Sequence, residues 1–156
     1  RQEYPSTPLE AFLTSGRCFV EESAISKCEA NCYTADFYGD IADGVLIPRE
    51  HGNYQEWYPP LREESYVIGV DVAEGLAYGD YSCAQVLDSK GNQVACWHGH
   101  IDPFDYGALV AMLGKRYNNA YIVVERNNHG LGTLRKIQDI QIYLWRVPLT
   151  APTEIA

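Results

Sequence analysis

Two apolar, β-branched segments of this 156-residue chain each end on a carboxylate. Residues Tyr66–Val70 are followed by Asp71, and residues Tyr121–Val124 are followed by Glu125. Continuous apolar runs of this length are typical of strands that are buried in a sheet covered by helices. An acidic side chain at the end of such a strand is costly to ionise unless something compensates it, and a bound divalent cation is the usual compensation. The two segments therefore predict a metal-binding edge of a sheet.

Composition sets limits on the partners that the chain can have. The fraction of hydrophobic residues is 46% and that of charged residues is 21%, both ordinary for a globular domain. No apolar stretch approaches the roughly 20 residues that a membrane span needs. The net charge of −9 argues against a chain that wraps broadly around nucleic acid. Basic contacts to DNA would have to be local, and the candidates late in the chain are Arg126, Arg135, Lys136 and Arg146.

The ends and the cysteines of the chain indicate its context. No signal peptide is visible and the first residue is Arg1, so we expect a cut point within a longer protein. An odd number of cysteines without a secretion signal favours reduced thiols in a cytosol. Cys83 and Cys96 fall in predicted strands, where we expect small core residues. A zinc site made from Cys18, Cys28, Cys32 and His51 is a weak alternative, because no paired C-x-x-C spacing is present.

Residues 1–64 are interpreted as a loop-rich linker that contains short helices. Residues Ser6–Glu10 have the cap, proline and acidic residue that are typical of a helix start. A second short helix is predicted over Glu22–Asn31. Short strands are predicted at Val45–Ile47 and Tyr54–Trp57, between Gly- and Pro-containing loops.

Residues 65–156 follow a more regular pattern of strands and helices. Asp102 is predicted to cap a helix that starts at Pro103, and a second helix is predicted over Gly130–Ile137. The expected strands are Tyr66–Val72, Ser82–Leu87, Gln93–Ile101, Ala120–Glu125 and Ile142–Val147. Three hairpin strands, a helix, a strand, a helix and a strand are the order of the ribonuclease H-like fold. In this mixed α/β sheet with flanking helices, the fourth strand lies parallel to the first, so Asp71 and Glu125 would face each other at the carboxyl edge.

Several blocks of sequence then resemble one family. EYPSTPLEAF at 3–12, GVDVAEG at 69–75, GDYS at 79–82 and VERNNHG at 124–130 resemble the large terminase subunit of tailed bacteriophages. That protein is a DNA-packaging motor with an N-terminal ATPase and a C-terminal nuclease. The resemblance runs from about Glu3 to Val147. It identifies the first block with the end of the ATPase region and the remaining blocks with the nuclease.

The resemblance implies a set of functional expectations. The metal-binding and catalytic acids of the family match Asp71 and Glu125, and Mg²⁺ or Mn²⁺ would be the cofactor. The expected partners are double-stranded DNA, the small terminase subunit and the portal protein, in the cytoplasm of a bacterial host that carries a phage or prophage. The family's third acid would lie beyond Ala156, and no phosphate-binding loop is present. We therefore expect 1–64 to be the end of the ATPase region with its linker, and 65–156 to be the first half of the nuclease domain, incomplete at the C-terminus.

The chemistry of phosphodiester cleavage explains why two acids would be needed. Two divalent ions can activate a water and stabilise the leaving oxygen, and Mg²⁺ and Mn²⁺ prefer oxygen ligands. Two carboxylates near 4 Å repel each other by about 4 kcal/mol at an effective dielectric of 20, and a cation between them reverses the sign. Asp71 would bridge both ions and Glu125 would bind one.

Each assignment has a structural alternative. Asp71 could cap the following Gly-rich turn, and Glu125 could form an ion pair with Arg126 or Lys136. Asp80 and Glu74 are weaker candidates for accessory ligands. The remaining candidates near Glu125 are Asn127 and Asn128, which could position it or contact DNA, and His129.

Two other functions stay open on the sequence alone. A sugar-kinase or actin-like phosphotransferase shares the acid at the end of strand one, the Gly-rich turn and three hairpin strands. A non-catalytic docking module of the packaging machinery would retain the fold without cleaving DNA.

Overall fold

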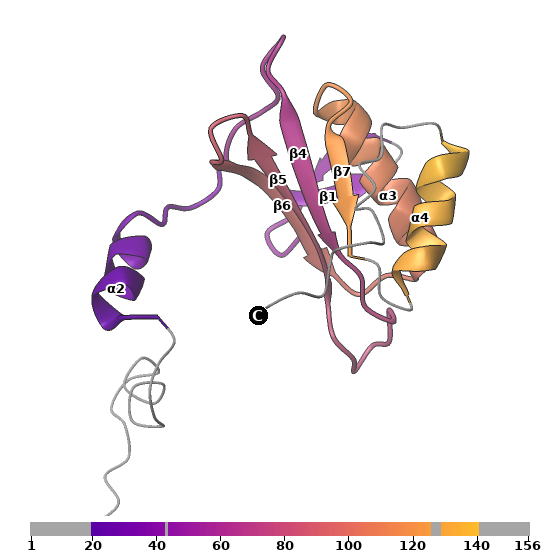
Figure 1. Ribbon diagram of the computed structural model, residues 1–156, viewed down its shortest axis with the longest axis horizontal. Helices are drawn as coiled ribbons and strands as arrows, with labels where there is room; N and C mark the ends of the chain where they lie inside the picture. Colours follow the sequence, from indigo (N-terminus) through magenta and orange to yellow (C-terminus); the bar gives the residue numbers. More distant parts are fainter. Residues whose placement is uncertain (1–19, 43, 126–128, 141–156) are drawn as a thin grey trace, which may run out of the picture. The chain divides into compact units, whose positions relative to one another are not determined.

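The computed structural model of the chain describes residues 20–42, 44–125 and 129–140 (Figure 1). The chain divides into two compact units, Arg1–Thr34 and Ala35–Ala156. Within the first unit, helix α2 spans Glu22–Ala30, where the sequence predicts a helix. The second unit holds all the strands and the other helices that are described.

The second unit is built on one mixed sheet. Its seven strands lie in the order β2-β1-β3-β6-β5-β4-β7. Strands β4 and β7 are parallel, and every other neighbouring pair is antiparallel. The parallel pairing of the strand that ends on Asp71 with the strand before Glu125 is therefore confirmed. The strands are β1 (Phe37–Ala42), β2 (Val45–Pro48), β3 (Tyr54–Glu56), β4 (Tyr66–Asp71), β5 (Ser82–Asp88), β6 (Gln93–Gly99) and β7 (Tyr121–Val124).

The N-terminal boundary of the sheet differs from the sequence prediction. The sequence predicts a linker that ends at residue 64, whereas β1, β2 and β3 extend the sheet itself, since β3 pairs with β6. Along the chain, the boundary between the two units therefore falls between Thr34 and Ala35. Strand β1 was not predicted because Gly39 and Asp40 interrupt its apolar pattern. The assignment of the segment before Ala35 to an ATPase region stays a prediction.

Helices α3 (Pro103–Arg116) and α4 (Gly130–Asp139) lie side by side on one face of the sheet (Figure 1). The Asp102 side chain accepts hydrogen bonds from the backbone N–H groups of Phe104 and Asp105, which confirms the predicted cap. Gly107 allows the close approach of the two helices, since a Cβ there would lie 2.7 Å from the Cβ of Lys136. The apolar core forms between these helices and alternate residues of the sheet.

The alternation along β4 defines the two faces of the sheet. Tyr66, Ile68 and Val70 are buried in the core, whereas the residues between them and Asp71 are exposed. We call the surface that carries these exposed residues the open face. It lies opposite to α3 and α4, and it includes the odd-numbered residues of β4, β5 and β7.

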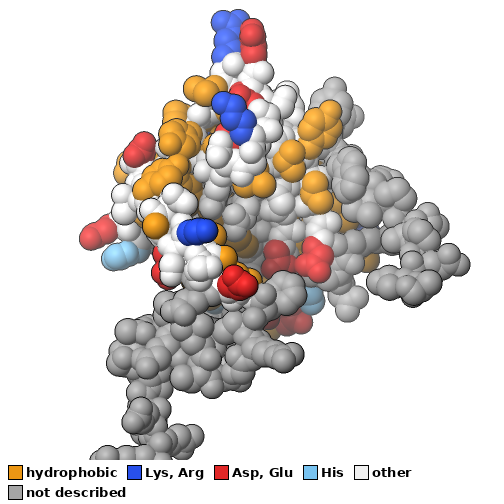
Figure 2. All heavy atoms as spheres, turned by 60° about the vertical axis from the view of Figure 1, so that its left-hand side comes forward, with side chains coloured by type: hydrophobic (Ala, Val, Ile, Leu, Met, Phe, Trp, Pro, Cys, Tyr) orange, Lys and Arg blue, Asp and Glu red, His pale blue; other side chains and the backbone are white. Residues whose placement is uncertain are grey.

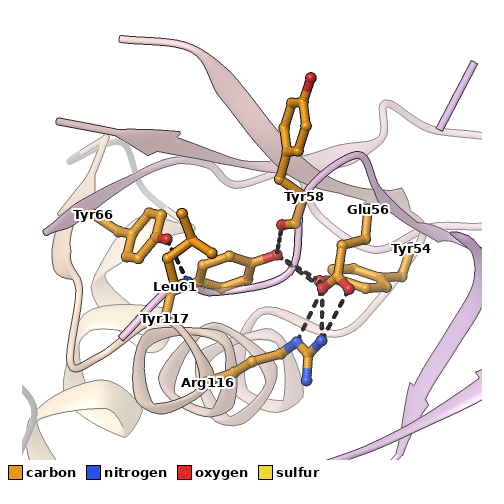
Figure 3. Close-up of polar contacts among 7 residues, drawn as sticks. All are labelled: Tyr54, Glu56, Tyr58, Leu61, Tyr66, Arg116 and Tyr117. Atoms are coloured by element: carbon orange, nitrogen blue, oxygen red, sulfur yellow. Dashed lines mark hydrogen bonds and ion pairs between the residues drawn. The ribbon is translucent and has the colours of Figure 1, made fainter. Parts of the chain in front are cut away.

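A buried carboxylate connects β3 to the end of α3 (Figure 3). Glu56 accepts hydrogen bonds from the Arg116 guanidinium at 2.7–3.1 Å, from the Tyr54 hydroxyl at 2.6 Å and from the Tyr117 hydroxyl at 2.9 Å. The Tyr117 hydroxyl also lies 3.3 Å from the carbonyl oxygen of Tyr58. The pairing satisfies a charge that would otherwise be costly to bury. This network joins the N-terminal strands to the helical layer.

Two predicted elements lie outside the described residues. These are the helix that starts near Ser6–Glu10 and the strand Ile142–Val147. Among the residues that are described, no helix is both long and apolar enough to cross a membrane.

Candidate metal centre

The two predicted acids lie on neighbouring strands at the same edge of the sheet. Val70 of β4 pairs with Val124 of β7, and the N–H of Glu125 donates a hydrogen bond of 3.0 Å to the carbonyl oxygen of Val70. The parallel pairing thus continues to Asp71 and Glu125. Paired residues of parallel strands point to the same face, so both carboxylates belong to the open face. Both residues are exposed.

The alternative roles of the two acids find no support among the described residues. The side chain of Asp71 makes no hydrogen bond to the turn that follows it, and neither acid belongs to an ion pair in the described part of the chain. Lys136, one expected partner of Glu125, instead lies over the ring of Phe104, with Nζ at 4.4 Å from the ring centroid. Both carboxylates are therefore available to an external cation.

Two local interactions hold the backbone of the loop after β4 in place. The N–H of Ala73 donates to the Ser82 hydroxyl at 3.0 Å, and Ser82 is fully buried. Gly75 has a φ of +78°, and a Cβ there would clash with the carbonyl oxygen of Ile101. Only glycine fits this combination of conformation and contact. The chain that leaves Asp71 therefore has a defined path.

A contact between side chains connects the two acidic segments. Oε1 of Glu74 lies 3.2 Å from Nε2 of His129, the residue before α4. Glu74 and His129 were both weak candidates for ligands, and the structure pairs them with each other. Asp80 is exposed in the neighbouring turn. Arg126, Asn127, Asn128 and Arg146 lie outside the described residues, so their expected roles stay predictions.

The open face next to Asp71 carries residues that sequence reasoning placed elsewhere. Cys83 is the strand partner of Asp71 on β5, and His98 is the partner of Cys83 on β6. The expectation that Cys83 and Cys96 are core residues is wrong, because both are half-buried on the open face and neither belongs to the core. The reason is that Ser82 takes the buried position of the alternation.

The two cysteines influence each other through their thiols. Their Sγ atoms lie 3.9 Å apart. A hydrogen bond from Cys96 lowers the pKa of the Cys83 thiol to about 7, although burial acts in the opposite direction. The pKa of Cys96 is raised, first by this hydrogen bond and then by burial. The first proton of the pair is therefore lost more easily than that of an ordinary thiol, and the second proton less easily.

The ring of Tyr81 stacks on His98 at 4.5 Å and on His100 at 4.0 Å between centroids, at the same end of the sheet. This stack belongs to the turn and strand next to the acidic edge. The stack holds the ring of His98 against Tyr81. Among the described residues, no group of three or more His, Cys, Asp and Glu side chains could hold a metal ion.

The pair of acids fits a hard divalent cation. Two exposed carboxylates on hydrogen-bonded strands present oxygen ligands of the kind that Mg²⁺ and Mn²⁺ prefer, and water can complete the coordination. The open carboxyl edge of a mixed sheet is also where such folds bind ligands. The mixed sheet, the parallel β4–β7 pair and the helices on one face place the chain in the ribonuclease H-like class of folds.

Solved structures with this arrangement are nuclease domains of large terminases. The large terminase nuclease from thermophilic phage G20c with bound magnesium is 21% identical with a TM-score of 0.56, over 72% of this chain and 62% of that one. The zinc-bound form is 22% identical with a TM-score of 0.54, over 70% of this chain and 66% of that one. The Thermus phage P74-26 large terminase nuclease domain is 18% identical with a TM-score of 0.51, over 74% of this chain and 55% of that one.

The chain therefore has the fold of the large terminase nuclease domain. It spans about 62% of the length of the magnesium-bound G20c nuclease. No family model and no curated protein matches it.

Proposed function

We propose that this chain is part of a divalent-metal-dependent endonuclease of a phage DNA-packaging motor, with Asp71 and Glu125 as its metal-binding catalytic residues. The observation that carries the proposal is the β4–β7 register, which brings the two acids side by side on the open face. The fold shared with phage terminase nucleases supports the same reading. The cofactor would be Mg²⁺ or Mn²⁺, and the substrate concatemeric double-stranded DNA.

The residues contribute position and charge to this chemistry. Asp71 and Glu125 supply oxygen ligands from two strands that hydrogen-bond each other, so the spacing between the ligands is set by the sheet. Bound divalent ions would activate a water and stabilise the leaving oxygen of the phosphodiester. The loop from Ala73 to Gly75 holds the backbone after Asp71 in place. Asp71 would bridge two ions and Glu125 would bind one.

The surface charge restricts how DNA would reach this centre. On the face drawn in Figure 2, Lys and Arg side chains are few and separated, and hydrophobic and acidic side chains outnumber them. With the net charge of −9, this argues for few phosphate contacts by this chain. The remaining contacts to DNA would come from further parts of the nuclease and from its partners, the small terminase subunit and the portal protein. The assembly would work in the cytoplasm of the bacterial host.

Metal binding and nicking of a supercoiled plasmid test the proposal on the chain itself. We expect Mn²⁺ to bind, as measured by calorimetry, and Asp71→Asn or Glu125→Gln to weaken binding by about 100-fold or more, because loss of a ligand exceeds the effect of outer-shell changes. Asp139→Asn, at the far end of α4, is the matched control and should bind as the unchanged chain does. The same two variants should not nick DNA.

The outcomes separate this proposal from its alternatives. Unchanged Mn²⁺ affinity in Asp71→Asn would overturn the assignment of the site. Mn²⁺ binding by the chain, with cleavage by the intact parent protein unchanged in Asp71→Asn, would instead favour a docking role in the packaging machinery. Binding of ATP in place of Mn²⁺-dependent nicking would favour a phosphotransferase.

A further inference from the structure

Two free thiols lie next to each other on the open face, and Cys83, one of the two, is the strand partner of Asp71. Cys83 on β5 and Cys96 on β6 come from adjacent antiparallel strands in the middle of the sheet. Their Sγ atoms are 3.9 Å apart, and both side chains are half-buried, so solvent reaches them. Nothing in the nuclease chemistry proposed above uses either thiol.

The separation of the sulfur atoms matches that of two ligands on one metal ion. Thiolates bind zinc at about 2.3 Å in tetrahedral geometry, which places two sulfur ligands about 3.8 Å apart. The observed distance of 3.9 Å is therefore close to the distance in such a site without movement of the strands. Both residues lie within strands that pair on either side, β5 with β4 and β6 with β3, which fixes their backbone.

The neighbours of the thiols determine how many ligands the chain offers. Nε2 of Gln85 lies 3.9 Å from the Sγ of Cys83. His98 is the strand partner of Cys83, but its ring stacks on Tyr81. The described residues thus offer two sulfur ligands, and since the open face is exposed, water would fill the remaining positions.

We propose that Cys83 and Cys96 form a two-thiolate site for a thiophilic divalent cation such as Zn²⁺ or Cd²⁺. Thiolates select soft and borderline ions, whereas the carboxylates of Asp71 and Glu125 select hard ones. On binding, both sulfur atoms coordinate as thiolates, each forms one sulfur–metal bond, and any proton that a thiol still carries is released to solvent. Because Cys83 is the strand partner of Asp71, the ion would lie next to the carboxylate centre. The proposal does not depend on the nuclease function.

Cadmium binding tests this site directly, in the full chain with Cys18, Cys28 and Cys32 replaced by serine and with a phosphine reductant present. We expect the ultraviolet charge-transfer band of cadmium thiolates to rise to one Cd²⁺ per chain. Protons should be released as the thiols bind, and both thiols should become protected from a thiol reagent. The further changes Cys83→Ser or Cys96→Ser should each reduce the band and weaken binding. Both together should abolish the band, while circular dichroism remains that of the folded chain.

A second variant separates the thiol site from the carboxylate centre. Asp71→Asn with Glu125→Gln should leave the cadmium band and its stoichiometry unchanged, even if Mn²⁺ binding is lost. Three results would overturn the proposal. They are one Cd²⁺ shared by two chains, a band that persists in Cys83→Ser at unchanged affinity, and a band that disappears with the carboxylates.

Discussion

Asp71 lies one residue beyond the last core residue of β4, and this single step decides which face of the sheet its carboxylate occupies. Glu125 likewise lies one residue beyond the end of β7, and its N–H donates a hydrogen bond to the carbonyl oxygen of Val70. Since a shift by one residue would reverse the face of every side chain in a strand, the register is as important to the site as the acids themselves.

The thiol of Cys83 provides a prediction at this scale. Because its pKa is lowered to about 7 by the hydrogen bond from Cys96, it is largely ionised at pH 8. We expect iodoacetamide to modify Cys83 before Cys96, whose pKa is raised. Mass spectrometry of peptides sampled during the reaction measures the order. In Cys96→Ala the reaction of Cys83 should need a higher pH. Equal rates at the two cysteines would contradict this account.

The residues show where sequence reasoning reached the site and where it did not. Asp71 and Glu125 could be found because an apolar run ends at each of them. The position of Cys83 could not, because hydrophobicity assigns cysteine to the core while a small hydroxyl residue, Ser82, takes that place and binds the backbone of Ala73. The choice depends on one hydrogen bond that exists only in the folded chain.

At the level of elements, the loop after β4 connects the acidic edge of the sheet to the segment that precedes α3. Gly75 provides a test of its rigidity, because its φ is positive and its Cα hydrogen faces the carbonyl of Ile101. Gly91, in the turn between β5 and β6, has a φ of +84° but open space around it. The two glycines therefore share the conformational requirement and differ in the contact.

We expect Gly91→Ala to reduce the free energy of unfolding by about 1–2 kcal/mol, the cost of a left-handed conformation. Gly75→Ala should cost about 1–3 kcal/mol more because of the added clash, and it should also weaken Mn²⁺ binding. Urea denaturation and calorimetry measure the two effects. Equal losses of stability for the two variants would show that the loop adapts to the extra carbon.

The elements that the sequence predicts have their pattern within their own residues, whereas the element that it does not predict depends on distant partners. The hairpin β5–β6, helix α3 with its Asp102 cap, and strands β4 and β7 have periodicity or caps within their own residues. Strand β1 lacks such a pattern and forms because β2 and β3 pair with both of its edges. Pairing partners distant in sequence cannot be read from a short window.

At the scale of the whole molecule, the Glu56 network holds the N-terminal strands to the helical layer. Arg116→Met would leave the Glu56 carboxylate buried without its partner. We expect the free energy of unfolding to fall by about 3 kcal/mol. The exposed pair of Arg49 with Asp40, at 3.1 Å, is the matched control, and Arg49→Met should cost less than about 1 kcal/mol. Chemical denaturation measures the free energy of unfolding of both variants. Similar small decreases in the two variants would contradict a structural role of the buried pair.

The buried tyrosines of this core predict the response to high pH. Burial, with further contributions from neighbouring charges, raises the pKa of Tyr54, Tyr106 and Tyr117 above the usual value of about 10. The folded state therefore holds protons that the unfolded state loses, so stability is complete below pH 10 and falls as the pH rises beyond it. The part of the tyrosinate absorbance that comes from these three buried rings should rise together with the change in circular dichroism, in one steep transition. Gradual ionisation of all tyrosines before unfolding would contradict this expectation.

The central claim is that one cation is held jointly by Asp71 and Glu125. Crystals of the chain grown with Mn²⁺, with data collected at the manganese absorption edge, test it most directly. We predict an anomalous peak between the two carboxylates on the open face, and its loss in Asp71→Asn. A folded chain with the two carboxylates more than about 8 Å apart, too far to share an ion that binds oxygen at about 2 Å, would contradict the account, as would manganese bound only elsewhere.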